Sequence, residues 1–256
     1  MKQSAFVVIL FFLAMVVAYA IYEIGLGNPA NFNDAAREVP NNLMGMTYVG
    51  GPLVSLLIAL SIIIFAVTIE RALTLKKAAG KQAIAKFFKK VVEQIRAGQI
   101  TEAVASCDSQ RGSVANVLKA ALTRYQEVTA DKSTVDPEKQ LVEVQRAVEE
   151  SMMLETPLLE KNLIVLSTVA SIGTMVGLLG TVIGMIRAFK ALAAGGAPDA
   201  IGLATGISEA LINTAGGLFA GILGIVAYNF FVNKVDNFTF QIDEANYNVM
   251  QLLKSK

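Results

Sequence analysis

The amino-acid sequence predicts an all-α integral membrane protein, with three long transmembrane helices, an N-terminal hydrophobic helix and a helical cytoplasmic domain. Of its 256 residues, 54% are hydrophobic and only 17% are charged, whereas soluble domains carry about 25% charged residues. Four long windows contain at most one charged residue each, and about 20 apolar residues are enough to cross a bilayer. The polar remainder repeats its apolar residues at helical spacing and shows no strand-like alternation.

Composition also excludes several classes of function. A formal net charge of +1 leaves no basic excess for binding nucleic acid. The chain has no His, which removes imidazole as a catalytic base or metal ligand. Its single Cys107 can form neither an internal disulfide nor a cysteine-rich metal site. We therefore expect no metal, no cofactor and no enzymatic activity, and a lipid bilayer as the surroundings.

The N-terminal hydrophobic window, 1–24, has two interpretations. Lys2, the apolar run and the sequence AYA at 18–20 resemble a secretory signal with its cleavage site. The run is also about long enough to be retained as a signal-anchor span, which we favour. In both cases segment 25–48 is expected in the periplasm, since Arg37 is the one basic residue of 23–38 against three acidic ones.

Charge distribution orients the remaining windows. Basic residues gather directly after the second window, within 71–81, and such clusters stay in the cytoplasm. Two glycines and a proline at 195–198 predict a turn on the opposite side. We expect transmembrane helices at 49–70, 162–190 and 200–233, a helical cytoplasmic domain at 71–161, a periplasmic loop at 191–199 and a cytoplasmic C-terminal helix at 234–256.

The cytoplasmic domain is helical in pattern. Its apolar residues recur at three-to-four spacing over 84–95. Asp136 followed by Pro137 predicts the N-cap and first residue of a further helix. Pro157 is expected to bend or interrupt that helix before the third span.

Small residues form a stripe on each of the last two spans. Because they recur every three or four residues, they share one helical face, and small residues allow helix backbones to approach closely. We expect these faces to pack against other helices and, in an assembly, to frame a passage. The glycines are Gly173, Gly177, Gly180 and Gly184 in the third span, and Gly217, Gly221 and Gly224 in the fourth.

Glu209 is the only charged residue of the fourth window. It lies ten residues beyond Asp199, which at 1.5 Å per residue is about 15 Å into the membrane and close to its midplane. A carboxylate at that depth costs about 2.5–3.5 kcal/mol, so it is expected to face protein or water. An ion pathway is the favoured role, and a buried ion pair with Arg187 or a hydrogen bond to Asn213 is the structural alternative.

Two threonines, Thr181 and Thr214, also fall at membrane depth. Threonine hydroxyls in helices often donate to the backbone of their own helix. Lining a polar passage, together with Glu209 and Asn213, is the alternative role.

These stretches together resemble the MotA/TolQ/ExbB proton-channel family, and most closely its ExbB/TolQ branch. The resemblance covers roughly 52–233. It is carried by 177–185 in the third span, by 206–215, 217–220 and 227–229 in the fourth, and by 98–107, 111–112 and 117–122 in the cytoplasmic domain.

The resemblance implies a subunit of a bacterial inner-membrane motor. Such a subunit forms a homopentamer around a dimer of a single-span ExbD/TolR-like partner, whose span carries an essential aspartate in the central pore. Proton flow is then coupled, through a TonB- or TolA-like protein, to work at the outer membrane. By position, Thr181 and Thr214 match the family's pore-lining threonines and Glu209 matches its membrane glutamate, with an electrostatic or proton-handling role.

The sequence departs from the family pattern in three places. Segment 173–176 lacks the proline that commonly precedes the third-span motif, Asn213 replaces a small apolar residue, and the N-terminal window adds a fourth span. A flagellar or gliding motor stator and a non-conducting membrane scaffold remain alternatives. The sequence also leaves open the coupled ion, proton or sodium, and the output of the machine.

Overall fold

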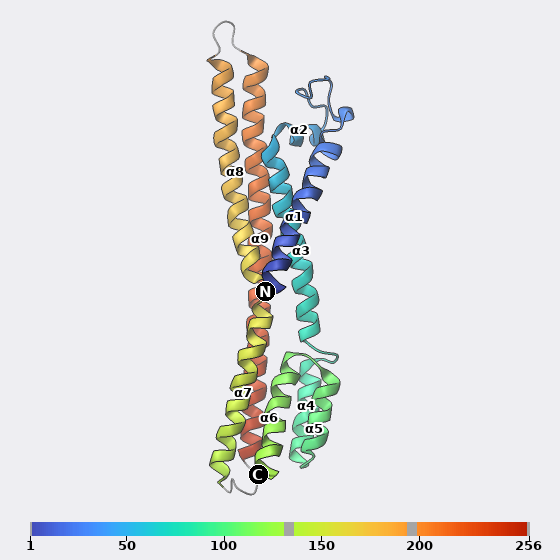
Figure 1. The fold of residues 1–256 in the computed structure, drawn as a ribbon, viewed down its shortest axis with the longest axis vertical. Coiled ribbons are helices and arrows are strands. Elements are labelled where there is room, and N and C mark those ends of the chain that lie inside the picture. The colour runs from blue at the N-terminus through green and yellow to red at the C-terminus, as the bar shows by residue number, and fades with distance from the viewer. Residues whose placement is uncertain (1, 131–135, 194–198, 255–256) are drawn as a thin grey trace. The chain divides into compact units, whose positions relative to one another are not determined.

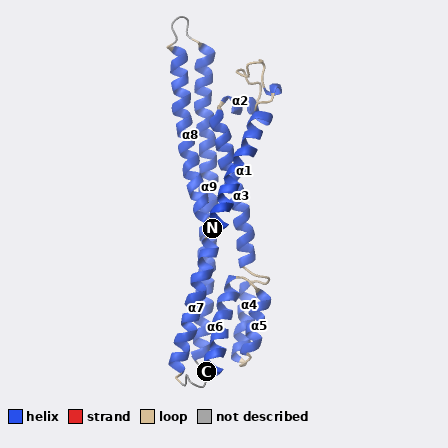
Figure 2. Cartoon of the chain, in the orientation of Figure 1, coloured by secondary structure: helices blue, strands red, loops and turns tan. Residues whose placement is uncertain are grey.

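The computed structural model describes residues 2–130, 136–193 and 199–254, and its regular elements in those ranges are helices (Figures 1 and 2). The prediction of an all-α fold is confirmed. Most of the predicted loop at 191–199, including its two glycines and proline, lies outside the described residues.

Four helical segments are long and apolar enough to cross a membrane. They are Val7–Leu26, Pro52–Ala78, Pro137–Leu192 and Ala200–Lys254. The chain divides into two compact units, which we call the membrane unit (Met1–Ile69 and Ile164–Asn229) and the polar unit (Glu70–Leu163 and Phe230–Lys256).

The membrane unit is built from long apolar helices. Their large apolar side chains point mostly outward, as in Phe12 and Met175, which are 65% and 69% exposed, and lipid is the medium that such a surface fits. The helices are α1 (Lys2–Ala20), extended by a π-helical turn (Ile21–Leu26), the short α2 (Leu43–Val49), α3 (Pro52–Ala78), α8 (Leu163–Leu192) and α9 (Ala200–Lys254).

Tyr48 of α2 organises the segment between α1 and α3. Its ring stacks on that of Tyr22 with the centroids 4.6 Å apart, and Phe32 meets it edge-on at 5.5 Å. The guanidinium of Arg37 lies 5.8 Å from the same ring centroid. Such aromatic and cation–π contacts each contribute about 0.5–1.5 kcal/mol, so this segment has a small core of its own.

Helices α8 and α9 lie side by side because glycine faces glycine (Figure 1). A Cβ atom added at Gly177 would lie 2.8 Å from the Cα atom of Gly217, and one added at Gly184 would lie 2.6 Å from the backbone nitrogen of Ala210. Further along, a Cβ atom at Gly224 would lie 2.6 Å from that of Ala170. A side chain at any of these glycines would therefore force the two helices apart.

Helix α9 is one uninterrupted helix over Ala200–Lys254, and it contains both the span predicted at 200–233 and the described part of the cytoplasmic C-terminal helix predicted at 234–256. The charges that begin at Lys234 mark a change of surroundings. They do not stop the helix, because no glycine or proline follows Gly224 within it.

The polar unit adds four helices to the ends of α3 and α9. Its core is apolar and closely packed, with Val91, Leu118, Leu122 and Val144 all fully buried. The helices are α4 (Ile84–Arg96), α5 (Ile100–Gln110), α6 (Ser113–Ala130) and α7 (Pro137–Glu160).

The two ends of α7 follow local chemistry. The side chain of Asp136 accepts a hydrogen bond from the backbone N–H of Glu138 at 3.0 Å, so it caps the helix as predicted. Pro157 remains inside α7, and the break comes later, where Asn162 adopts a left-handed backbone conformation (φ 61°). The helix therefore ends a few residues after the proline.

Cys107 lies in the core of the polar unit. It is 2% exposed, and burial raises the pKa of its thiol to about 12. Because the thiolate is the reactive form of cysteine, this residue is a structural apolar side chain.

Arg71 is the largest fully buried side chain of the polar unit. Its Nη2 and Nε atoms donate to the Glu70 carboxylate at 2.5 and 2.7 Å, and Nη1 donates to the carbonyl of Leu159 at 3.4 Å. Thr74 and Asn162 also donate to Glu70, at 3.1 and 3.3 Å. The guanidinium is therefore held by groups from α3 and α7 at once.

Candidate functional site

Glu209, on the third turn of α9, is buried and paired with an arginine of α8. Its side chain is 4% exposed, and Nη1 of Arg187 donates to its two carboxylate oxygens at 2.8 and 2.7 Å. Arg187 itself is 56% exposed. Of the roles that the sequence left open for Glu209, the ion pair with Arg187 is the arrangement present in the isolated subunit.

Asn213 follows Glu209 by one helical turn and is completely buried. Its Nδ2 atom donates to the carbonyl of Gly50 at 2.7 Å and to that of Glu209 at 2.9 Å. A reversed amide would set its oxygen against these two carbonyl oxygens, so the orientation is determined by its partners. Its Oδ1 atom is buried without a hydrogen-bond partner, and a buried acceptor in that state costs about 1–3 kcal/mol.

Gly51 closes the site from the side of α3. A Cβ atom there would lie 2.8 Å from Oε1 of Glu209 and 3.8 Å from Nη1 of Arg187. The residue also has φ +79°, a conformation that glycine adopts without strain. The pair Gly50–Gly51, ahead of a long apolar helix, was missed in the sequence. The signal for it was the Gly-Gly-Pro sequence at 50–52.

The contact with Gly51 changes the expected depth of Glu209. Gly51 directly precedes Pro52, the first residue of α3, and the charge-free stretch 52–69 that follows is about 27 Å long at 1.5 Å per residue. That length takes up most of a hydrocarbon core of about 30 Å. Glu209 therefore lies level with one end of α3. A midplane position for Glu209 would require the membrane to begin at Asp199.

The two threonines use their hydroxyl protons within their own helices. Thr181 donates to the carbonyl of Leu178 at 2.5 Å, and Thr214 donates to that of Ala210 at 3.2 Å. Within the described residues, no hydrogen bond joins the threonines to each other or to Glu209. The structure therefore brings together Glu209, Arg187 and Asn213, and leaves each threonine oxygen with lone pairs that can accept from water.

The remaining predicted residues, the glycines of the two stripes, lie between α8 and α9. Gly180 faces the side chain of Asn213, and Gly217 faces Gly177. Glycine at 180 therefore gives the buried amide its room. The close approach of the two helices also positions Arg187 opposite Glu209.

Comparison with known proteins agrees with this architecture. A model of the MotA/TolQ/ExbB proton channel family matches residues 79–244. The chain belongs to this family. The resemblance found in the sequence is thereby confirmed, and the glycine stripes, Glu209 and both threonines all fall inside the matched part of the MotA/TolQ/ExbB domain.

Individual relatives carry names from the ExbB/TolQ branch. The Tol-Pal system protein TolQ of Pseudomonas aeruginosa is 33% identical over 153 residues, which are 60% of this chain and 66% of that protein. TolQ of Haemophilus influenzae is 43% identical over 93 residues, 36% of this chain and 41% of the relative. The biopolymer transport protein ExbB of Pseudomonas putida is 37% identical over 89 residues, 35% of this chain and 27% of the relative. The chain thus spans less than two thirds of each of these relatives.

Proposed function

We propose that this chain is the proton-channel subunit of an ExbB/TolQ-like, energy-transducing motor in the bacterial inner membrane, where it crosses the bilayer several times. Family membership supports the class of machine. The observation that carries the proposal for this chain is the buried Glu209, held by a half-exposed Arg187 at the end of a membrane span. A buried charge in a transmembrane helix is costly and marks an ion pathway more often than a packing contact.

One subunit does not supply a complete proton relay. Apart from Glu209, the windows 162–186 and 200–233 contain no charged residue and no histidine. A second titratable group must then come from another chain. A dimer of an ExbD/TolR-like single-span protein, enclosed by a homopentamer of this subunit, would bring such a group to the ring of Glu209 side chains.

The threonines are assigned to the walls of the same path. Each hydroxyl donates its proton to a carbonyl of its own helix, so the oxygen can take part in further hydrogen bonds only as an acceptor. It can therefore accept a hydrogen bond from a water molecule in the path. The work available is about 2.3 kcal/mol per elementary charge for every 100 mV of membrane potential. A TonB- or TolA-like protein would carry this work to the outer membrane, and a flagellar or gliding stator is the alternative output.

Proton flux tests the proposal directly. The full chain, purified with the single-span protein that accompanies it, is reconstituted into vesicles that contain a pH-sensitive dye. We expect Glu209→Gln, and Thr181→Val combined with Thr214→Val, to reduce flux at least tenfold. Glu244→Gln, which removes an exposed carboxylate from the same helix, is the matched control and should conduct normally.

A non-conducting scaffold is the second candidate, and the closed ion pair between Arg187 and Glu209 favours it. In that case Glu209→Gln should disperse the oligomer, which native mass spectrometry detects. An intact oligomer with lost flux supports the channel, whereas normal flux in Glu209→Gln excludes it.

A further inference from the structure

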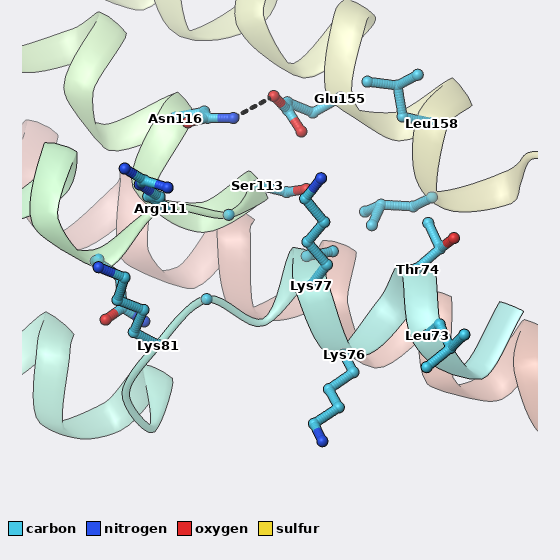
Figure 3. A pocket seen from close by; sticks show the side chains of 15 residues that line it. Leu73, Thr74, Lys76, Lys77, Lys81, Arg111, Ser113, Asn116, Glu155 and Leu158 are labelled. Atoms are coloured by element: carbon cyan, nitrogen blue, oxygen red, sulfur yellow. Dashed lines mark hydrogen bonds between the residues drawn. The ribbon is translucent and has the colours of Figure 1, made fainter. Parts of the chain in front are cut away.

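The polar unit contains a pocket of about 650 Å³ that the proposed function does not use (Figure 3). It lies where the end of α3, the connection to α4, the start of α6 and the end of α7 meet. Four basic residues line it, Lys76, Lys77, Lys81 and Arg111, against the single carboxylate of Glu155.

Within the described residues, the four bases of this pocket share it with one carboxylate only, that of Glu155. None of the four forms an ion pair, whereas Lys119 and Arg124, farther along the same unit, pair with Asp108 and Glu143 at 2.5 and 2.6 Å. The Glu155 carboxylate, which accepts a hydrogen bond from Asn116 at 2.7 Å (Figure 3), offsets one of the four positive charges. The pocket therefore keeps an excess of positive charge and of free N–H donors.

Hydrogen bonds fix the backbone that carries two of the bases, Lys81 and Arg111. The side-chain oxygen of Gln110 accepts from the N–H of Gln82 at 3.1 Å, and its Nε2 donates to the carbonyl of Gln82 at 2.8 Å. The N–H of Lys81 donates to the carbonyl of Gln110 at 3.0 Å. These hydrogen bonds hold Lys81 beside the turn that contains Arg111, so little backbone entropy is lost when both side chains bind one ligand.

The start of α6 adds to the positive field. The carbonyl of Gly112 accepts the first bond of this helix, from the N–H of Asn116 at 3.0 Å. The 18-residue helix thus begins with Ser113 inside the pocket. Helix N-termini carry about half a positive charge and favour anions such as phosphate.

The opposite wall is apolar. Leu73 and Leu158 line the pocket and are 63% and 55% exposed. The pocket therefore suits an anion with an apolar portion better than a bare inorganic ion. Lys77 follows Ile69, the last residue of the charge-free stretch, by eight residues of α3, or about 12 Å, which leaves a lipid headgroup within reach of its long side chain.

We propose that this pocket binds a phosphate-bearing anion, with Lys77, Lys81 and Arg111 as its ligands. In Figure 3 the side chain of Lys77 extends toward Ser113, and that of Lys76 points away from the other labelled groups. The phosphate is either the headgroup of an anionic phospholipid or a free phosphate compound.

Two probes distinguish the sources of the phosphate. The full chain in detergent is titrated with phosphatidylglycerol and, as a zwitterionic control, phosphatidylcholine, and retained lipid is counted by native mass spectrometry. In parallel, inorganic phosphate is titrated while the ³¹P NMR line width is followed. We expect Lys77→Gln combined with Lys81→Gln to weaken binding at least tenfold, because charge-assisted hydrogen bonds to phosphate are lost.

The matched control is Lys89→Gln combined with Lys90→Gln, which removes two exposed charges from α4 of the same unit. Loss of phosphatidylglycerol in the pocket variant alone supports a lipid headgroup, and phosphate line broadening that only this variant abolishes supports a free phosphate compound. Equal binding in the natural chain and both variants, or an equal loss in both variants, overturns the proposal.

Discussion

Within the described residues, each unit holds one ion pair with a buried member, and the buried member is the arginine in one unit and the glutamate in the other. In the polar unit the arginine is the hidden member, since Arg71 is fully buried and Glu70 is 27% exposed. In the membrane unit the carboxylate is hidden, since Glu209 is 4% exposed and Arg187 is 56% exposed. A guanidinium held from several sides is a structural element, whereas an arginine with an open side can exchange its partner.

The surroundings of the two pairs support this distinction. Thr74 and Asn162 complete the bonding of Glu70, and the carbonyl of Leu159 takes a further bond of Arg71. Next to Glu209, by contrast, Asn213 retains a buried oxygen without a partner. Fully bonded networks make a structure rigid, and incompletely bonded ones are common at functional sites.

The largest effect on stability is expected from Arg71→Met. Removing one member of a buried ion pair leaves the other uncompensated, which costs about 3–5 kcal/mol. Thermal unfolding in detergent, followed by circular dichroism at 222 nm, measures the loss. Arg124→Met removes an exposed arginine of the same unit and should have little effect; equal melting temperatures for the two variants would contradict the structural role of Arg71.

Arg187→Gln tests whether the ion pair of the membrane unit has a different role from the ion pair of the polar unit. The carboxylate left behind, Glu209, is buried, but a glutamine at 187 can still donate an amide hydrogen bond to it, which a methionine at 71 cannot do for Glu70. We therefore expect a smaller loss of stability, about 1–2 kcal/mol, together with a loss of proton flux of at least tenfold. Arg187→Lys should retain part of the flux, since a cation remains opposite Glu209. A melting temperature that falls as far as that of Arg71→Met would show that the two pairs serve the same purpose.

Gly51→Ala tests whether the carboxylate depends on the turn before α3. A side chain at φ +79° costs about 1–2 kcal/mol, and its Cβ atom would press on Oε1 of Glu209. Gly25→Ala is the control, because nothing lies within 4 Å of the added atom. We expect only Gly51→Ala to reduce both the melting temperature and the proton flux. If Gly51→Ala changed neither, the turn at Gly51 would not contribute to the site.

The smallest effect is expected at the surface pair of Arg124 and Glu143. The Arg124 guanidinium lowers the pKa of the Glu143 carboxyl, so the pair contributes stability above the ordinary glutamate pKa of about 4.3, and that contribution is lost as the pH falls through the lowered value. Glu143→Gln should thus melt slightly below the natural chain at pH 7 and together with it near pH 2. A difference that grows toward acidic pH would reverse the sign of this linkage.

Much of the fold follows from local composition. The length and charge of a window determine whether a helix can cross a membrane, so the four apolar helices were predictable one at a time. The glycine stripes were equally visible, because spacing along one helix defines a face. The boundary predicted at Lys234 separates a membrane span from a cytoplasmic helix, and α9 runs through it because the helix propensities do not change there.

The site was predictable only in part. Glu209 and Asn213 stand out as polar residues in an apolar window, but the choice between ion pair and pathway depends on a residue 22 positions away. That choice is set by the register of α8 against α9, which arises from the backbone contact at Gly177 and Gly217. Gly51 could not be assigned either, because its role requires knowing which helix end meets Glu209.

The burial of Cys107 has a practical consequence for chemistry on the rest of the molecule. Its thiol is buried and its pKa is raised by that burial, so we expect the natural chain to react slowly with maleimide reagents, which need an accessible thiolate. A cysteine introduced in place of Thr181 or Thr214 would then react alone. The reaction rates of such cysteines in living cells would show which positions along the two spans are in contact with water, without the need to replace Cys107 first.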